Sequence, residues 1–110
     1  MKTSELNGPA LDWAVAKCEG KEKNWGKSRL KPYPMHCGQR YSTDWAQGGP
    51  IIEREKMAIM LCESVGDWLA DLSGTYKVFT AFGPTPLVAA MRCYVASKLG
   101  DEVDVPEELK

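Results

Sequence analysis

The apolar residues near the start of the chain recur at i, i+3, i+4 and i+7, the spacing of one face of an α-helix. They are Leu11, Ala14, Val15 and Cys18. Asn7 precedes them as a candidate helix cap, and Gly20 follows them at a position typical of a helix end. The pattern predicts a first helix over residues 8–19.

Three short apolar runs in the middle of the chain indicate strands. Residues 57–62 are apolar throughout and too short for a typical core helix, so a buried strand is predicted. Residues 68–72 alternate in polarity, and residues 76–82 are rich in β-branched and aromatic side chains. Turns at Gly66 and Gly74 would join these runs into a three-stranded antiparallel meander.

A second helix is predicted over residues 85–99. Thr85 is a natural N-cap, Pro86 suits the first helical position, and Gly100 suits the end. Its apolar residues cover more than one stripe, so the helix needs cover on two sides. The sheet supplies one cover, and either the first helix or a second subunit supplies the other. The nearly all-round apolar character of this helix favours the second alternative, so we expect a homodimer or a higher closed oligomer.

These elements predict an α+β fold, in which the antiparallel meander packs against the C-terminal helix and an N-terminal helix is added. A chain of 110 residues fits one domain with a modest core. We expect this domain over residues 1–100, with residues 21–40 as an irregular basic loop. Residues 101–110 hold five acids and one Lys, and we expect this acidic tail to fray.

Basic and aromatic residues alternate in the loop at 21–40, where Trp25 and Tyr33 stand among lysines and arginines. Such a stretch could contact phosphates and stack bases, although a solvated loop is the favoured interpretation. The formal net charge of −1 gives no general electrostatic case for nucleic acid or an anionic membrane as partner.

Cysteine and histidine content argues against a metal site. The four cysteines, Cys18, Cys37, Cys62 and Cys93, form no CxxC pair, and His36 is the only histidine. A site built from His36, Cys37 and two distant cysteines is the weak alternative. We expect four free thiols, countable by labelling under denaturing, non-reducing conditions.

No pattern of a catalytic or nucleotide-binding loop occurs, whether P-loop, GxSxG or HExxH. A magnesium or paired-carboxylate site at Asp44, Glu53 and Glu55 is less favoured than ordinary surface carboxylates. We therefore predict no enzyme activity and no cofactor. No run approaches the ~18 apolar residues of a membrane span, and no signal peptide is found, so a reducing cytoplasm is expected.

Residues 41–55 show neither helical nor strand periodicity throughout. Gly48 and Gly49 would let the backbone adopt positive φ or approach another group, and Pro50 would begin a new element, helix or strand. One interpretation is a linker whose Trp45 plugs the edge of the core. The other is a recognition loop on a rigid scaffold.

A binding site is predicted where this segment meets the start of the last helix. An aromatic ring could stack a base, the glycine pair or the helix start could receive an anion, and an arginine could pair with phosphate. The candidate ligand-binding residues are Tyr41, Asp44, Trp45, Gln47, Gly48, Gly49, Arg54, Thr85 and Arg92. Together they suit a nucleotide-like phosphorylated ligand, although each also has a structural interpretation as a cap, turn, core edge or surface ion pair.

Long stretches of the sequence resemble the NinX family of phage accessory proteins. They are DWAQGGPIIERE at 44–55, GPTPLVAAMR at 83–92, ALDWAVAK at 10–17 and YVASKLG at 94–100. The resemblance covers most of the chain outside residues 21–40. It implies a phage gene expressed in the host bacterial cytoplasm, and no activity, because the family is a domain of unknown function with no agreed catalytic residues.

A small phage protein without catalytic residues could act by binding alone. The favoured hypothesis is that it sequesters a host signalling nucleotide and so counters host defence. One alternative is a protein-binding inhibitor of a host factor, acting through Trp25, Tyr33 and Trp45. Another is a weak nucleic-acid-binding module that uses residues 21–31.

Overall fold

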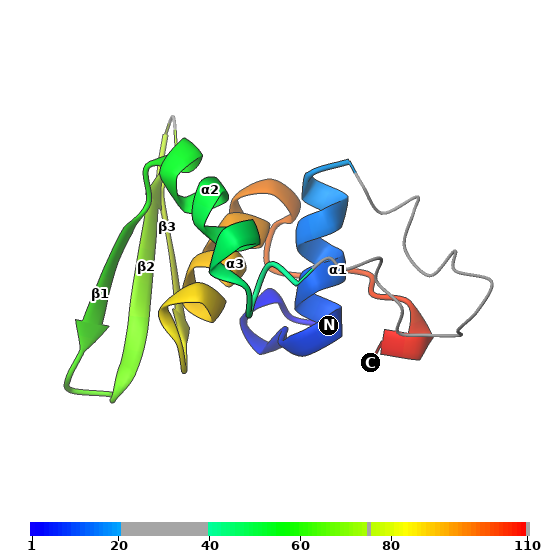
Figure 1. The fold of residues 1–110 in the computed structure, drawn as a ribbon, viewed down its shortest axis with the longest axis horizontal. Helices are drawn as coiled ribbons and strands as arrows, with labels where there is room; N and C mark the ends of the chain where they lie inside the picture. Colours follow the sequence, from blue (N-terminus) through cyan, green and yellow to red (C-terminus); the bar gives the residue numbers. More distant parts are fainter. Residues whose placement is uncertain (21–39, 75, 110) are drawn as a thin grey trace.

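The computed structural model describes residues 1–20, 40–74 and 76–109, and the middle of the chain forms the predicted meander. Its strands are β1 (Ala58–Cys62), β2 (Asp67–Ser73) and β3 (Val78–Gly83), paired antiparallel in the order β1-β2-β3. The sheet forms one end of the molecule, and the helices lie on one of its faces (Figure 1). The predicted α+β fold is confirmed.

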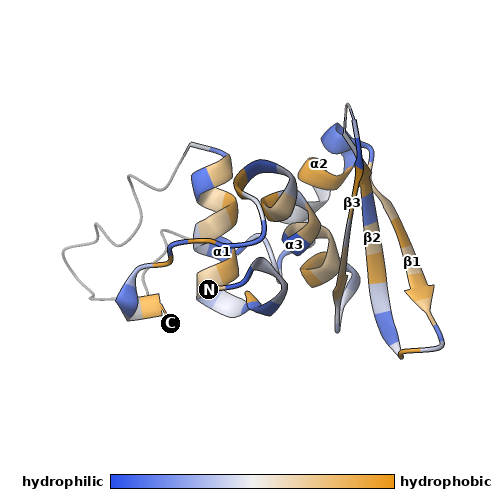
Figure 2. Cartoon of the chain, turned by 180° about the vertical axis from the view of Figure 1, so that it is seen from behind, coloured by the Kyte–Doolittle hydropathy of each residue, from blue (hydrophilic) through white to orange (hydrophobic). Residues whose placement is uncertain are grey.

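The prediction that the first strand is buried is wrong. β1 is an edge strand, and Met60 and Leu61 are each 50% exposed. Only β2 has a strand on both sides, and its Ala70 and Leu72 are buried. An apolar run can belong to either kind of strand, because the run does not reveal what its neighbours cover. Figure 2 shows β1 as an apolar ribbon at the outer limit of the sheet.

Helix α3 (Pro86–Leu99) lies at the centre of the fold. The Thr85 hydroxyl accepts a hydrogen bond from the Val88 N–H at 3.1 Å, as a helix cap does, and the helix ends at Gly100. The sheet packs on one side of α3, α1 packs on the opposite side, and α2 also contacts α3 (Figure 1). Its apolar surface is thus covered within one chain, and a second subunit is not needed to cover it.

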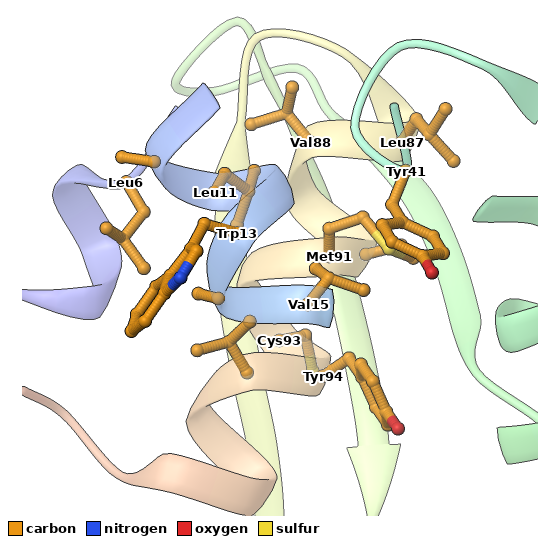
Figure 3. Packing of buried hydrophobic residues seen from close by; sticks show 14 of the residues in the cluster. Leu6, Leu11, Trp13, Val15, Tyr41, Leu87, Val88, Met91, Cys93 and Tyr94 are labelled. Carbon is orange, nitrogen blue, oxygen red and sulfur yellow. The ribbon is translucent and has the colours of Figure 1, made fainter. Parts of the chain in front are cut away.

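Helix α1 (Gly8–Cys18) follows the predicted boundaries and is buried over Ala10–Ala16. Leu11, Trp13 and Val15 all belong to the core cluster that includes Met91 of α3, and Trp13 points to a different side of α1 from Val15 (Figure 3). Asn7 holds the cap position but its side chain makes no capping hydrogen bond. Buried Asp12 lies among these apolar residues, and its partner is part of the candidate site.

Most of the segment 41–55, which was interpreted as a linker or a recognition loop, forms helix α2 (Trp45–Glu55). Its cap is Asp44, whose Oδ1 accepts the Ala46 N–H at 2.9 Å. Gly48, Gly49 and Pro50 lie inside this helix, and neither glycine has positive φ. The recognition-loop interpretation is therefore wrong, and residues 50–55 are helical.

At Gly48 the backbone closely approaches another segment, which was the second of the two roles predicted for the glycine pair. A Cβ at this position would lie 2.4 Å from the Tyr41 carbonyl oxygen and 2.6 Å from Leu87 Cδ1. Contacts this short leave no room for any side chain. Tertiary packing here outweighs the low helix propensity of glycine and proline, which sequence periodicity does not register.

The C-terminal segment does not fray, because it is bound to the N-terminus. The N-terminal amine donates to the Val103 carbonyl and the Val103 N–H donates to the Met1 carbonyl, both at 2.8 Å. The Thr3 N–H, in the short helix η1 (Thr3–Glu5), donates to the Asp101 carbonyl at 2.8 Å. Val103, Val105 and Leu109, the last in the short helix η3 (Glu107–Leu109), are buried. The prediction of a frayed tail followed from the five acids of this segment and did not take its two valines into account.

Cys18, Cys62 and Cys93 are free thiols in the structure. Burial raises the pKa of the Cys18 and Cys93 thiols to about 12. Cys37, His36 and the predicted basic loop, with Trp25 and Tyr33, lie outside the described residues. Within the described part of the chain, no group of His, Cys, Asp and Glu could hold a metal ion, and no helix is long and apolar enough to cross a membrane.

Candidate functional site

A hollow of about 230 Å³, here called the Trp45 pocket, lies between the start of α2 and the start of α3. Trp45 and Thr85, far apart in the sequence, both line it, and Trp45 is 54% exposed. The lining residues are Ser42, Thr43, Trp45, Thr85, Leu87 and Val88. The structure therefore brings together the two segments from which the sequence predicted a site.

A buried carboxylate of α1 fixes one wall of the Trp45 pocket. Asp12 Oδ1 accepts the Ser42 N–H at 2.8 Å and the Ser42 hydroxyl at 2.7 Å, and both residues are buried. The turn over residues 41–43 is closed further by the Asp44 N–H, which donates to the Arg40 carbonyl at 2.8 Å. Because α1 is packed on α3, Asp12 sets the position of this wall relative to the start of α3.

Five other predicted site residues build the frame of the pocket and are not among its lining residues: Tyr41, Asp44, Gln47, Gly48 and Gly49. Gln47 Nε2 donates to Asp44 Oδ2 at 3.2 Å, and Gln47 Oε1 accepts the Arg40 N–H at 2.8 Å. Tyr41 is buried in the core, where burial raises its pKa, and so it offers no free ring for stacking. Gly48 lies against Leu87. Gly49, half-buried, faces Trp45, whose Cε3 would lie 3.8 Å from an added Cβ.

Arg54 belongs to an ion-pair cluster away from the pocket. Its Nη1 and Nη2 donate to the two carboxylate oxygens of Glu19 at 3.1 and 2.8 Å, and its Nε donates to Glu55 at 2.9 Å. Tyr94 donates its hydroxyl proton to Glu19 and accepts from Arg54 Nη2 at 3.0 Å. This cluster joins the C-terminal ends of α1 and α2 to α3.

Arg92 lies in a second, larger hollow of about 470 Å³ beside β3. Its Nε donates to the Leu6 carbonyl at 2.7 Å and its Nη1 to the Phe82 carbonyl at 2.9 Å. Burial lowers the pKa of Arg92, and the opposing effect of Asp67 is smaller. This hollow shares no described lining residue with the Trp45 pocket, and Asp67, Asp101 and Glu102 line it together with Lys2. An anion is therefore poorly matched to it.

A family model described as Bacteriophage P22, NinX matches residues 2–98. The chain belongs to the NinX family. The match runs from the N-terminus to the last turn of α3, so both walls of the Trp45 pocket lie within it. It confirms the resemblance seen in the sequence and makes this NinX family member a phage accessory protein. A search of the curated proteins finds none that matches.

The sequence analysis missed several residues that shape the site in this NinX family member. Leu87 and Val88 supply the apolar lining, and Asp12 supplies the buried carboxylate that holds Ser42. Glu19, which pairs with Arg54 away from the pocket, was missed as well. An aspartate inside the apolar stretch at 10–16 was the one available signal, because a buried acid requires a partner. Nothing in the spacing of Glu19 and Arg54 indicates that they pair.

The Tyr94 hydroxyl predicts how stability depends on alkaline pH. Burial, followed by the hydrogen bond to Glu19, raises the pKa of Tyr94 above its ordinary value of 10.0. A raised pKa in the folded state adds stability that is complete below pH 10 and is lost as the pH rises toward the folded-state pKa. We expect the free energy of unfolding to fall above pH 10, by up to about 1.4 kcal/mol per pH unit from this group.

Urea denaturation at pH 9 to 11 measures this effect. Tyr94→Phe should show a shallower fall in stability with pH, and Tyr76→Phe should follow the unmodified protein because Tyr76 is 98% exposed. Equal pH dependence in both variants would show that Tyr94 does not carry the effect.

Proposed function

We propose that this NinX family member is a non-enzymatic binding protein whose Trp45 pocket receives the planar ring of a small nucleotide-like ligand. Sequestration of that ligand from a host defence pathway would be its role in the infected bacterium. The observation that supports the proposal is the half-exposed Trp45 in the lining of a hollow that Thr85 also lines. Base-on-tryptophan stacking is worth about 1–3 kcal/mol and needs an accessible ring face.

The chemistry of the lining favours the ring of the ligand over its phosphates. Leu87 and Val88 are apolar, and among the described residues no charged side chain lines the pocket. The hydroxyls of Thr43 and Thr85 can donate to the edge of a base. A volume of about 230 Å³ lies below the range usual for drug-sized ligands, so the ring would enter and the phosphates would stay outside.

Phosphates at the mouth of the pocket would lie near the N-terminus of α3, which carries a partial positive charge. The arginines predicted to hold phosphate are engaged elsewhere, Arg54 with Glu19 and Arg92 with two backbone carbonyls. We therefore expect binding to depend weakly on salt, since few charges would be neutralised. Arg54→Ala and Arg92→Ala should act through stability and leave the affinity of the folded protein nearly unchanged.

A second function, inhibition of a host protein, is favoured by the same apolar lining. A hollow of this size fits one aromatic or aliphatic side chain of a partner, and half-exposed tryptophans are common at the centre of such contacts. The two functions differ in the binding partner that should stabilise the folded protein: a small base-containing compound in the first, and a host protein in the second.

Thermal unfolding with a panel of nucleosides, nucleoside monophosphates, cyclic mononucleotides and cyclic dinucleotides tests the proposal. A ligand at a hundred times its dissociation constant should stabilise the protein by about 2.7 kcal/mol. We expect stabilisation by compounds that share a base, with similar shifts at low and high salt. Absence of any shift across the panel would refute the ligand proposal, and host-protein inhibition would become the favoured function.

A further inference from the structure

The larger hollow beside β3, here called the Arg92 hollow, has the size of a small-molecule site. Its volume of about 470 Å³ lies within the range usual for such sites, whereas that of the Trp45 pocket lies below it. Arg92 and Ala96 of α3 both line it, and they lie four residues apart and so on one face of the helix. The small side chain of Ala96 leaves room beside the guanidinium. The function proposed for the Trp45 pocket makes no use of this hollow.

Arg92 places fixed hydrogen-bond donors in the hollow. The Leu6 and Phe82 carbonyls hold its guanidinium through Nε and Nη1, at 2.7 and 2.9 Å. A guanidinium has five N–H donors, and Nη2 makes no hydrogen bond or ion pair with any residue in the described part of the chain. Asp67 lies near enough to act on the pKa of Arg92, but the two form no ion pair. The guanidinium is therefore held in a position to donate to an oxygen atom of a bound molecule.

Carboxylates lie in the hollow beyond the other end of α3. Asp101 and Glu102 follow the helix, and both are exposed. Backbone contacts fix their positions, because the Thr3 N–H donates to the Asp101 carbonyl at 2.8 Å and Glu102 forms a β-bridge with Lys2. Lys2 lies directly opposite Glu102 in this bridge, so its charge offsets one of the two acids. A net negative charge is left, and this end of the hollow suits an ammonium group.

The separation of the two ends sets the length of a ligand that reaches both. An α-helix rises about 1.5 Å per residue, so Arg92 and Leu99 lie about 10 Å apart along α3, and Asp101 follows two residues later. In a single α-amino acid the amine and the carboxylate share one carbon atom, so that molecule is too short. An extended peptide spans about 3.3–3.6 Å per residue, so two or three residues cover the distance.

We propose that the Arg92 hollow binds a short peptide of two or three residues with free termini. Its ammonium group lies among Asp101 and Glu102, and its carboxylate accepts hydrogen bonds from Arg92 Nη2. The described lining holds three acids and two cations, so a doubly charged anion such as phosphate is disfavoured. The Ser4 hydroxyl, also in the lining, can accept from a peptide N–H.

A nuclear magnetic resonance titration of isotope-labelled protein with trialanine tests the proposal. We expect a dissociation constant of about 0.1 to 1 mM, as is usual for a ligand of this size, and shifts of the amide signals of the lining residues. N-acetyl-trialanine should bind at least about tenfold more weakly, because it has lost a charge-assisted hydrogen bond. Trialanine amide should lose less affinity, because its amide oxygen can still accept from Arg92 and because Asp67 offsets part of the arginine charge.

Two further compounds test the length and the charge of the ligand. L-alanine should bind much more weakly than trialanine, because it cannot reach both ends of the hollow. 1,6-Diaminohexane carries ammonium groups without a carboxylate, and it should also bind more weakly. No shifts with trialanine at up to about 10 mM would overturn the proposal. Equal or tighter binding of diaminohexane would overturn it too, since the hollow would then be an acidic surface for cations.

A double variant, Asp101→Asn with Glu102→Gln, removes the proposed partners of the ammonium group. It should weaken trialanine binding at least about tenfold and leave N-acetyl-trialanine unaffected, because that peptide has no ammonium group. The matched control is Asp104→Asn, an exposed acid of the same segment outside the described lining, and it should change neither affinity. Circular dichroism verifies that the variants are folded. Equal weakening of both peptides by the double variant would show that these acids do not hold the ammonium group.

Ala96→Leu fills the hollow and changes no charge. Leucine is a good helix former, so α3 should persist, while the larger side chain occupies the space beside Arg92. We expect this variant to lose the trialanine shifts. Unchanged trialanine affinity in folded Ala96→Leu would place the peptide outside the Arg92 hollow and overturn the proposal.

Discussion

Replacing Gly48 by alanine is expected to lower the free energy of unfolding by about 3 kcal/mol. The new Cβ would lie 2.4 Å from the Tyr41 carbonyl oxygen, a backbone atom that cannot move aside without displacing the turn before α2. It would also lie 2.6 Å from Leu87 Cδ1, so the start of α3 would shift. Leu87 lines the Trp45 pocket, and Tyr41 precedes the lining residue Ser42. We therefore expect Gly48→Ala to weaken ligand binding as well as stability.

Gly49→Ala is the matched control because it changes the adjacent residue of the same helix. Apart from its chain neighbours and the backbone of its own helix, the nearest atom to its Cβ would be Trp45 Cε3 at 3.8 Å, an ordinary contact. Alanine favours helix over glycine by about 0.8–1 kcal/mol, whereas Pro50 disfavours a Cβ on the helical residue before it, so the two effects oppose each other and this variant should cost much less stability than Gly48→Ala. Urea denaturation of the two variants measures the difference. Equal effects would mean that Gly48 is not in close contact with Tyr41.

Asp12→Ala is expected to lower the free energy of unfolding by about 3 kcal/mol, the second large effect. The change leaves the buried Ser42 N–H and hydroxyl without their acceptor, and an unsatisfied buried donor costs about 1–3 kcal/mol. The turn over residues 41–43 would lose its attachment to α1, and the Trp45 pocket would lose a fixed wall.

Two smaller changes at the same contact serve as controls for Asp12→Ala. Asp12→Asn keeps an acceptor oxygen and should cost less, whereas Ser42→Ala removes one of the two hydrogen bonds and should cost about 1 kcal/mol. Chemical denaturation ranks the three variants. Equal stability of Asp12→Ala and Ser42→Ala would show that the Ser42 N–H finds another acceptor.

Local signals in the sequence predicted α3 and the sheet because several of them agree. Thr85, Pro86 and Gly100 mark the two ends of α3, and the turns at Gly66 and Gly74 separate strands of matched length. Where local preference and tertiary packing disagree, as at α2, the prediction failed. Gly48 is helical because Tyr41 and Leu87 leave it no room for a side chain, and that contact joins residues distant in the sequence.

The candidate site was predictable only in part, for the same reason. The meeting of Trp45 with Thr85 followed from two recognisable segments, the aromatic one and the helix start. The expectation that Arg54 would hold phosphate depended on its being free, and Glu19, at the C-cap of α1, pairs with it in the structure. Ion pairs between distant residues leave no periodic signal in one sequence. The ion pair between Arg54 and Glu19 therefore could not be predicted.

The measurement that tests the binding account most directly compares Trp45→Ala with the unmodified protein, in both stability and ligand affinity. Trp45 is 54% exposed, so its loss should change the free energy of unfolding by less than about 1 kcal/mol. Loss of stacking should weaken binding of the base-containing compound by about 5- to 150-fold. A drop in stability of about 3–5 kcal/mol, as for a core tryptophan, with no ligand-induced shift in the unmodified protein would contradict the account.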